Sequence, residues 1–94
     1  MPTQDSRIDV KISDSIEFVT SLRHIGLEYG VLKISNIPPD TVRQLFEFAA
    51  VQYLLPFCVS LKSDELAFET PDARIVGIGY IAGDQTGLLS IDIE

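Results

Sequence analysis

The last third of the chain is a series of short apolar runs separated by closely spaced turn residues. The runs are FCVSLK (57–62), LAFET (66–70), RIVGIGYIA (74–82) and LLSIDIE (88–94). Between them stand Ser63-Asp64-Glu65, Pro71-Asp72-Ala73 and Gly83-Asp84-Gln85-Thr86-Gly87. Apolar runs of this length joined by short turns are typical of antiparallel strands. The sequence therefore predicts a four-strand meander over residues 57–94.

The first 56 residues change between strand and helix patterns. Residues 7–12 alternate apolar and polar side chains, which indicates a half-buried strand. Asp14 and Glu17 have the spacing of a helix capping box, and apolar residues then recur at helical spacing, so we expect a helix over 14–25 that stops at Gly26. A second strand over 27–37 and a second helix over 39–54 follow.

Strands grouped beside separate helices indicate the α+β class. We expect the order β-α-β-α-β-β-β-β, with two helices packed on a mainly antiparallel sheet in one small domain, residues 1–94, of which 1–6 are disordered. The sheet is expected to contribute Ile8, Val10, Ile12, Val59, Leu61, Phe68, Val76, Ile78, Leu89 and Ile91 to the core. The helices are expected to add Ile16, Val19, Leu22, Val42, Leu45, Phe46 and Ala49.

Composition excludes several classes of protein. Hydrophobic residues make up 46% of the chain and charged residues 22%, which excludes a disordered or collagen-like chain. No apolar run approaches the roughly 20 residues of a membrane helix, and the N-terminus has no apolar signal-peptide core. The expected location is therefore cytoplasmic. A net charge of -7 argues against direct binding of nucleic acid, because phosphate contacts need clustered Lys and Arg.

Cys58 and His24 are the only residues of their kinds. They are too few for a zinc site of the usual Cys/His type, and the loop at Asp84 offers too few oxygens for calcium, so we expect neither metal nor cofactor. Within its apolar run, Cys58 is expected to pack as a small hydrophobic residue. A nucleophilic Cys58–His24 pair stays open, because such pairs meet only in space.

Two glycines stand close together in the run 74–82. GIGYIA (77–82) matches the G-x-G-x-x-A spacing of a dinucleotide-binding loop, which requires a strand, a turn and then a helix. Another strand pattern follows here instead, so we reject nucleotide binding. Gly77 and Gly79 leave one strand face bare, which allows the close approach of a helix or forms a groove for a ligand or partner.

The second half of the helix expected over 39–54 lacks a polar face. After Glu47 the sequence is FAAVQYLLPF, with Gln52 as its only strongly polar residue. A helix that is apolar all round is buried, either beneath the sheet and loops or against another chain. If another chain covers it, the self-association surface is formed by Phe48, Val51, Tyr53 and Leu55.

Charge is distributed unevenly along the chain. Residues 1–62 carry seven acids and six bases, net -1, whereas residues 63–94 carry seven acids and one base, net -6. This acidic third is either a solvated face that aids solubility or a surface for a basic protein partner. The expected partner-binding residues are Asp64, Glu65, Glu69, Asp92 and Glu94.

These patterns favour a binding protein over an enzyme. No HExxH, Walker or GxSxG motif is present. We expect a small acidic, non-enzymatic protein of the inhibitor, immunity or adaptor type that acts through a protein–protein surface, with a homodimer as a further expectation. The alternative is a small-molecule sensor or an accessory subunit of a larger complex. A small enzyme is the third and least favoured interpretation.

Overall fold

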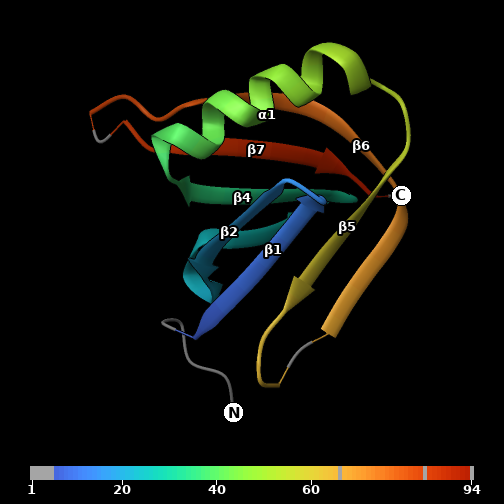
Figure 1. The fold of residues 1–94 in the computed structure, drawn as a ribbon. Coiled ribbons are helices and arrows are strands. Elements are labelled where there is room, and N and C mark those ends of the chain that lie inside the picture. The colour runs from blue at the N-terminus through green and yellow to red at the C-terminus, as the bar shows by residue number, and fades with distance from the viewer. Residues whose placement is uncertain (1–5, 66, 84, 94) are drawn as a thin grey trace.

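The fold is built from one antiparallel sheet and one helix (Figure 1), in a computed structural model that describes residues 6–65, 67–83 and 85–93. In chain order the elements are β1 (Arg7–Ser13), β2 (Ile16–Ser21), the short 3-10 helix η1 (Leu22–His24), β3 (Ile25–Glu28), β4 (Val31–Ile37), α1 (Pro39–Gln52), β5 (Phe57–Lys62), β6 (Ala67–Tyr80) and β7 (Gly87–Asp92). The α+β class expected from the sequence is confirmed, with one helix in place of two.

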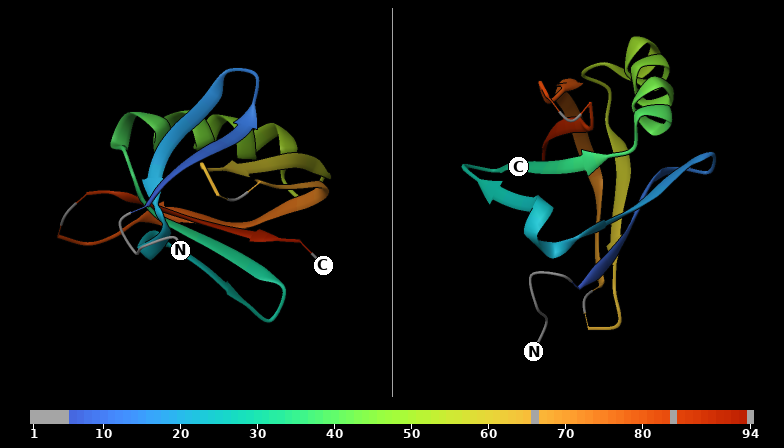
Figure 2. Two further views of the ribbon diagram at one scale, coloured as in Figure 1. Left: turned by 90° about the horizontal axis from the view of Figure 1, so that it is seen from below. Right: turned by 90° about the vertical axis from the view of Figure 1, so that its left-hand side faces the viewer.

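The seven described strands form a single sheet in the order β2-β1-β5-β6-β7-β4-β3. Two hairpins, β1–β2 and β3–β4, flank the meander β5–β6–β7, because β1 pairs with β5 and β4 pairs with β7. The sheet curls strongly, and α1 lies across one end of its concave side (Figures 1 and 2). The helix therefore closes the core at that end.

The expected helix over residues 14–25 is wrong: this segment is strand β2 followed by η1. Ile16, Phe18 and Thr20 are buried while the residues between them are exposed, which is the period of a strand. The segment is rich in β-branched and aromatic residues, and that preference overrides the capping-box spacing. Asp14 lies instead in the β1–β2 turn, where the N–H of Ser15 donates to Ser13 Oγ at 3.3 Å.

The strand expected over 27–37 is a hairpin. Tyr29 and Gly30 form its two-residue turn with φ angles of 54° and 77°, between Glu28 and Val31. Both central residues of a type I′ turn need positive φ, which Gly30 adopts without strain. This turn has no clear signal in the sequence, because Tyr29 is an unusual residue at its first position.

The two strands expected over 66–70 and 74–82 are one strand, β6, so the C-terminal meander has three strands. Pro71 does not interrupt β6 because the pairing with β5 shifts register there: Phe57 pairs with Ala73 and Val59 with Thr70. Such bulges are positions where a sheet accommodates proline. The strand expected over 57–62 is confirmed, and the second helix is confirmed with its end at Gln52.

The core fills the concave side of the sheet beneath α1. Most of the expected core residues are buried there, including Ile8, Val10, Val42 and Leu45. Three residues expected in the core are exposed instead. Val19, Phe46 and Val76 have 46%, 42% and 44% of their surface exposed. Val19 was assigned a helical position, and the bulge between Ile75 and Gly77 turns Val76 outward. Phe68, Ile78 and Leu22 are half-buried against the core.

The start of the chain is tied to the fold at Ser6, whose carbonyl accepts a hydrogen bond from the N–H of Leu22 at 3.0 Å. Residues 1–5, which make up most of the expected disordered segment, lie outside the described residues. Within the described part, the structure has no helix with the length and apolar character needed to cross a membrane.

Candidate protein-binding surface

Helix α1 is fixed by its first turn and by two buried residues. Pro39 occupies the start of the helix, where its missing N–H removes no helical hydrogen bond, and Asp40 lies in the first turn. The N–H of Val42 donates to the Pro38 carbonyl at 3.0 Å. Val42 and Leu45 are fully buried and anchor the helix to the sheet.

Both flanks of α1 make aromatic contacts with the sheet. Phe46 packs against Tyr80 of β6, with ring centroids 6.1 Å apart, and Phe48 meets Phe57 of β5 edge-on at 5.3 Å. Phe48 is half-buried by its contact, but Phe46 and Tyr80 keep 42% and 50% of their surface exposed. The Phe46–Tyr80 pair is therefore a partly exposed aromatic contact between the helix and β6.

The C-terminal end of α1 leaves a run of apolar side chains in solvent. Leu54 has a φ of 65°, a conformation usually reserved for Gly or Asn at this position. The turn is held by hydrogen bonds from the Leu55 N–H to the Gln52 carbonyl (2.9 Å) and from Gln52 Nε2 to the Pro56 carbonyl (3.2 Å). Tyr53, Leu54 and Leu55 are each more than half exposed.

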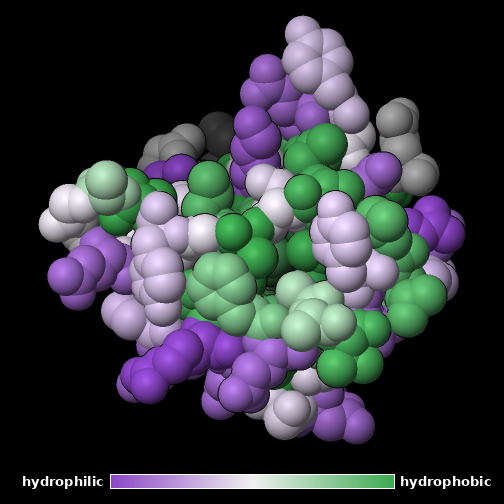
Figure 3. All heavy atoms as spheres, turned by 90° about the horizontal axis from the view of Figure 1, so that it is seen from above, coloured by the Kyte–Doolittle hydropathy of each residue, from purple (hydrophilic) through white to green (hydrophobic). Residues whose placement is uncertain are grey.

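Together these exposed residues define what we call the α1 surface. Its members are Phe46, Val51, Tyr53, Leu54, Leu55 and Tyr80. Figure 3 looks down on the helix and shows hydrophobic side chains in the middle of this face, with hydrophilic ones at its margin. Phe46 and Tyr80 lie on the β6 side of the helix, whereas Val51 borders a hollow with Gln44 and Glu47 on the β1–β2 side. Large exposed apolar side chains gathered on one element are candidates for an interaction site.

The sequence-based self-association set overlaps the α1 surface in part. Val51, Tyr53 and Leu55 lie on it, whereas Phe48 turns inward toward Phe57. Leu54 and Tyr80 were not expected on this surface, and Phe46 was expected in the core. Leu54 stands in the same unbroken apolar run, but nothing in the sequence brings Tyr80 next to the helix.

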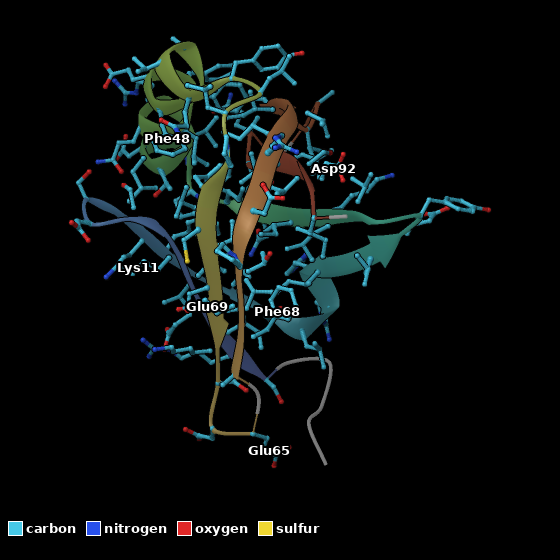
Figure 4. The ribbon with its side chains drawn as sticks, turned by 90° about the vertical axis from the view of Figure 1, so that its right-hand side faces the viewer. Lys11, Phe48, Glu65, Phe68, Glu69 and Asp92 are labelled. Carbon is cyan, nitrogen blue, oxygen red and sulfur yellow. The ribbon has the colours of Figure 1, made fainter. Side chains whose placement is uncertain are left out.

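The expected acidic partner site is spread along the molecule. Asp64 and Glu65 are exposed in the β5–β6 connection, Glu69 is exposed on β6, and Asp92 is half-buried on β7. Figure 4 shows Glu65 at the far end of the β5–β6 hairpin, Glu69 midway and Asp92 toward the helix end. Glu94 lies outside the described residues. The structure therefore does not gather the four described carboxylates into one cluster.

Basic residues are interleaved with these acids. Asp92 pairs in register with Arg74, whose guanidinium also lies 3.4 Å from the carboxylate of Asp72. Lys11 and Glu69 are in register with Ser60 from either side, and Lys11 Nζ lies 3.9 Å from Glu17. A hollow beside Asp64 and Glu65 is also lined by bases, namely Arg7 and Lys62. The outer face thus carries mixed charge, and the acidic excess acts through the field of the whole molecule.

Gly77 and Gly79 lie on β6 but α1 does not pack on them. A Cβ at Gly77 would meet only Ser90, at 3.6 Å, and a Cβ at Gly79 would meet nothing within 4 Å. The helix packs on Gly87 instead, where a Cβ would overlap Val42. The expectation of helix packing at Gly77 and Gly79 is therefore wrong, and their use as a groove stays a prediction.

Cys58 and His24 lie on different parts of the sheet. Cys58 is exposed on β5, which corrects the expectation that it packs inside. His24 ends η1 beside β4, with its Nδ1 3.4 Å from Ser35 Oγ. Strands β6 and β7 stand between β5 and β4, so the fold does not bring the thiol to the imidazole.

Two further observations bear on the chemistry of this surface. Among the residues that the structure describes, no three His, Cys, Asp or Glu side chains come together as metal ligands. Comparison with known protein families, curated proteins and solved structures gives no match.

Proposed function

We propose that this chain is a small, non-enzymatic binding protein that holds a protein partner on the α1 surface. The observation that carries the proposal is the exposed run Tyr53-Leu54-Leu55 beside Val51, which is 79% exposed. Burying these side chains against a partner would remove apolar area from water, which is the main driving force of protein association. Such a protein acts as an inhibitor, an adaptor or an accessory subunit.

The backbone at Leu54 supports the same proposal. A leucine at φ 65° costs stability that Gly or Asn at the same position would not. Strained residues that project exposed side chains are frequent at binding sites, where the strain is tolerated for function. Here the strain holds an apolar side chain at the point where α1 meets the loop to β5.

The net charge of -7 favours a basic partner. Because acids and bases alternate on the outer face of the sheet, we assign the charge to long-range steering and the apolar α1 surface to the contact itself. This division differs from a site made of carboxylates alone, and it predicts that apolar substitutions change the dissociation rate while charge substitutions change the association rate.

The test is affinity capture from the lysate of the source cells, followed by binding measurements with the purified partner. Val51→Lys is expected to weaken binding at least tenfold, because it places a charge in the contact. The matched control is Val19→Lys, which introduces the same charge at an exposed valine on β2, opposite Asp9. Equal binding by both variants and the wild type would exclude the α1 surface as the contact.

A further inference from the structure

The two edges of the sheet are unlike. At the β2 edge, the hydroxyl of Thr20 donates to the carbonyl of Ser35 on β4 at 3.2 Å, so the curled sheet partly closes over this strand. At the other edge, β3 pairs with β4 alone among the described strands. The β3–β4 hairpin projects beyond the rest of the molecule (Figure 2).

Strand β3 is protected only by its short length of four residues and by the charge of Glu28, with no proline, lysine or bulge. Natural edge strands are commonly protected by proline, lysine or a bulge. The sequence of β3 is Ile25-Gly26-Leu27-Glu28, and its pairing with β4 is regular throughout. Leu27 is 65% exposed and Tyr29, in the adjoining turn, is 92% exposed. This edge therefore offers both backbone groups and apolar surface to another strand.

We propose that β3 pairs antiparallel with β3 of a second copy of this chain, with the two Leu27 residues opposite each other on the twofold axis. The hairpin geometry sets this register. In a two-residue hairpin the flanking residues, Glu28 and Val31, form a hydrogen-bonded pair, so Leu27 directs its own N–H and C=O to the free edge. Two symmetric hydrogen bonds then join Leu27 to Leu27 of the second copy.

A pair of opposite charges, Lys33 and Glu28 of the second copy, favours a second copy as the occupant. The same register places the two Glu28 side chains diagonally about 7–8 Å apart, so two attractive pairs stand against one repulsive pair. In this register Glu28 of the second copy lies opposite Gly26, and Gly26 lies opposite Lys33 on its other side. A Cβ at Gly26 would meet nothing within 4 Å, so the space above it is free. Two strand spacings separate Lys33 from Glu28 of the second copy by about 10 Å between backbones, which extended lysine and glutamate side chains span together.

Symmetry makes this ion pair twice in one dimer. Neither Glu28 nor Lys33 forms an ion pair within the part of the chain that the structure describes, and both are exposed. Each is therefore available to the other copy. The inference stands apart from the proposed function, because β3 and α1 are separate surfaces.

The experiment is sedimentation velocity on the full chain at increasing concentration. The wild type is expected to dimerise, and Glu28→Lys and Lys33→Glu are each expected to raise the dimer dissociation constant about tenfold, because each turns two attractive pairs into repulsive ones. Leu27→Pro is expected to abolish the dimer while keeping the fold, because its lost N–H faces the free edge.

A mixture of Glu28→Lys and Lys33→Glu is the decisive sample. In the mixed dimer one copy carries lysine at both positions and the other carries glutamate at both, so each of the two cross-copy pairs again joins opposite charges. Wild-type affinity is therefore expected to return, although each variant alone dimerises about tenfold more weakly. The control mixture replaces Lys33→Glu with Val51→Glu, which adds negative charge on α1 and keeps its own dimer. In its mixed dimer with Glu28→Lys only one of the two cross-copy pairs joins opposite charges, so the Glu28→Lys copy is not expected to regain wild-type affinity.

Three results overturn the proposal. The first is a wild type that stays monomeric at high micromolar concentration. The second is a dimer that Val51→Glu disrupts, because the contact would then lie on α1. The third is a mixture of the two charge variants that shows no rescue.

Discussion

At the scale of single residues, Gly87 sets how closely α1 approaches the sheet. It is buried, and a Cβ built on it would overlap Val42 Cγ2 and lie 3.3 Å from the Cβ atoms of Val42 and Ile37. Val42 is itself fully buried, so the helix has no room to move aside without disturbing the core. One missing methyl group thus determines the position of the surface on which the proposed function depends.

We predict that Gly87→Ala destabilises the fold by about 1–3 kcal/mol, the usual cost of overpacking a core. Gly79→Ala on β6 is the matched control, because a Cβ there meets nothing within 4 Å. The control is expected to be neutral or slightly stabilising, since alanine restricts the unfolded chain. Urea unfolding of both variants checks the contrast. Equal losses of stability would show that α1 does not pack on Gly87 as described.

A second contrast separates neighbouring residues of α1. Leu45→Ala is expected to cost about 2–5 kcal/mol, because Leu45 is fully buried and its removal leaves a cavity. Phe46→Ala is expected to cost about 1 kcal/mol, the order of an aromatic pair, because Phe46 is 42% exposed and its main contact is Tyr80. Thermal or urea unfolding that ranks Phe46 above Leu45 would contradict the assigned face of the helix.

At the scale of elements, the end of α1 is destabilised by the positive φ of Leu54, which also holds an apolar side chain in solvent. We predict that Leu54→Gly raises stability by about 0.5–1 kcal/mol, because glycine adopts the φ of 65° without strain. Leu55→Gly, one residue later, serves as the control and is expected to lose stability, since φ is positive at Leu54 but not at Leu55. The Leu54 variant is also expected to bind its partner more weakly, so stability and affinity should change in opposite directions.

Sequence patterns predicted some elements well and others badly, for identifiable reasons. β1 and β5 have an unambiguous period, and both are confirmed. The helix α1 is confirmed from its start at Pro39, but it ends at Gln52, two residues before the expected end. The residues of β2 fit both a helical and a strand period, and only burial of Ile16 and Phe18 against the sheet decides between them. Pro71 was interpreted as a strand end because a bulge depends on the partner strand, which a sequence does not show.

The residues of the α1 surface also differ in how well the sequence predicts them. The exposed run at the end of α1 could be predicted, because its residues are consecutive in the chain. The contact between Phe46 and Tyr80 joins residues 34 positions apart and depends on how α1 lies on β6, so no local pattern reveals it. Likewise, the separation of Glu69 from Asp92 follows from the length of β6 and its bulges.

At the scale of the whole molecule, the field of the acidic excess should act on encounter and leave the fold unaffected. We predict that reversing Asp64 and Glu69 to Lys, which changes the net charge from -7 to -3, slows association with a basic partner and shifts stability by no more than about 0.5 kcal/mol. Stopped-flow association at low and high salt measures the effect, which should vanish at high salt as charges are screened. If the association rate at low salt is unchanged by the two substitutions, the acidic excess serves only solubility and does not steer the partner.

The order of the strands also determines when this chain can fold during its synthesis. The hairpins β1–β2 and β3–β4 are made first, yet β1 pairs onward only with β5 and β4 only with β7. Their inner edges, and apolar residues such as Val10 and Ile34, therefore stay without a partner on the ribosome until residues 57–92 emerge. During that interval the nascent chain exposes four strands with open edges, the state that chaperones recognise and that aggregates most readily. Translation speed across the last third of the message should thus affect the yield of folded protein, because it sets how long these edges stay open.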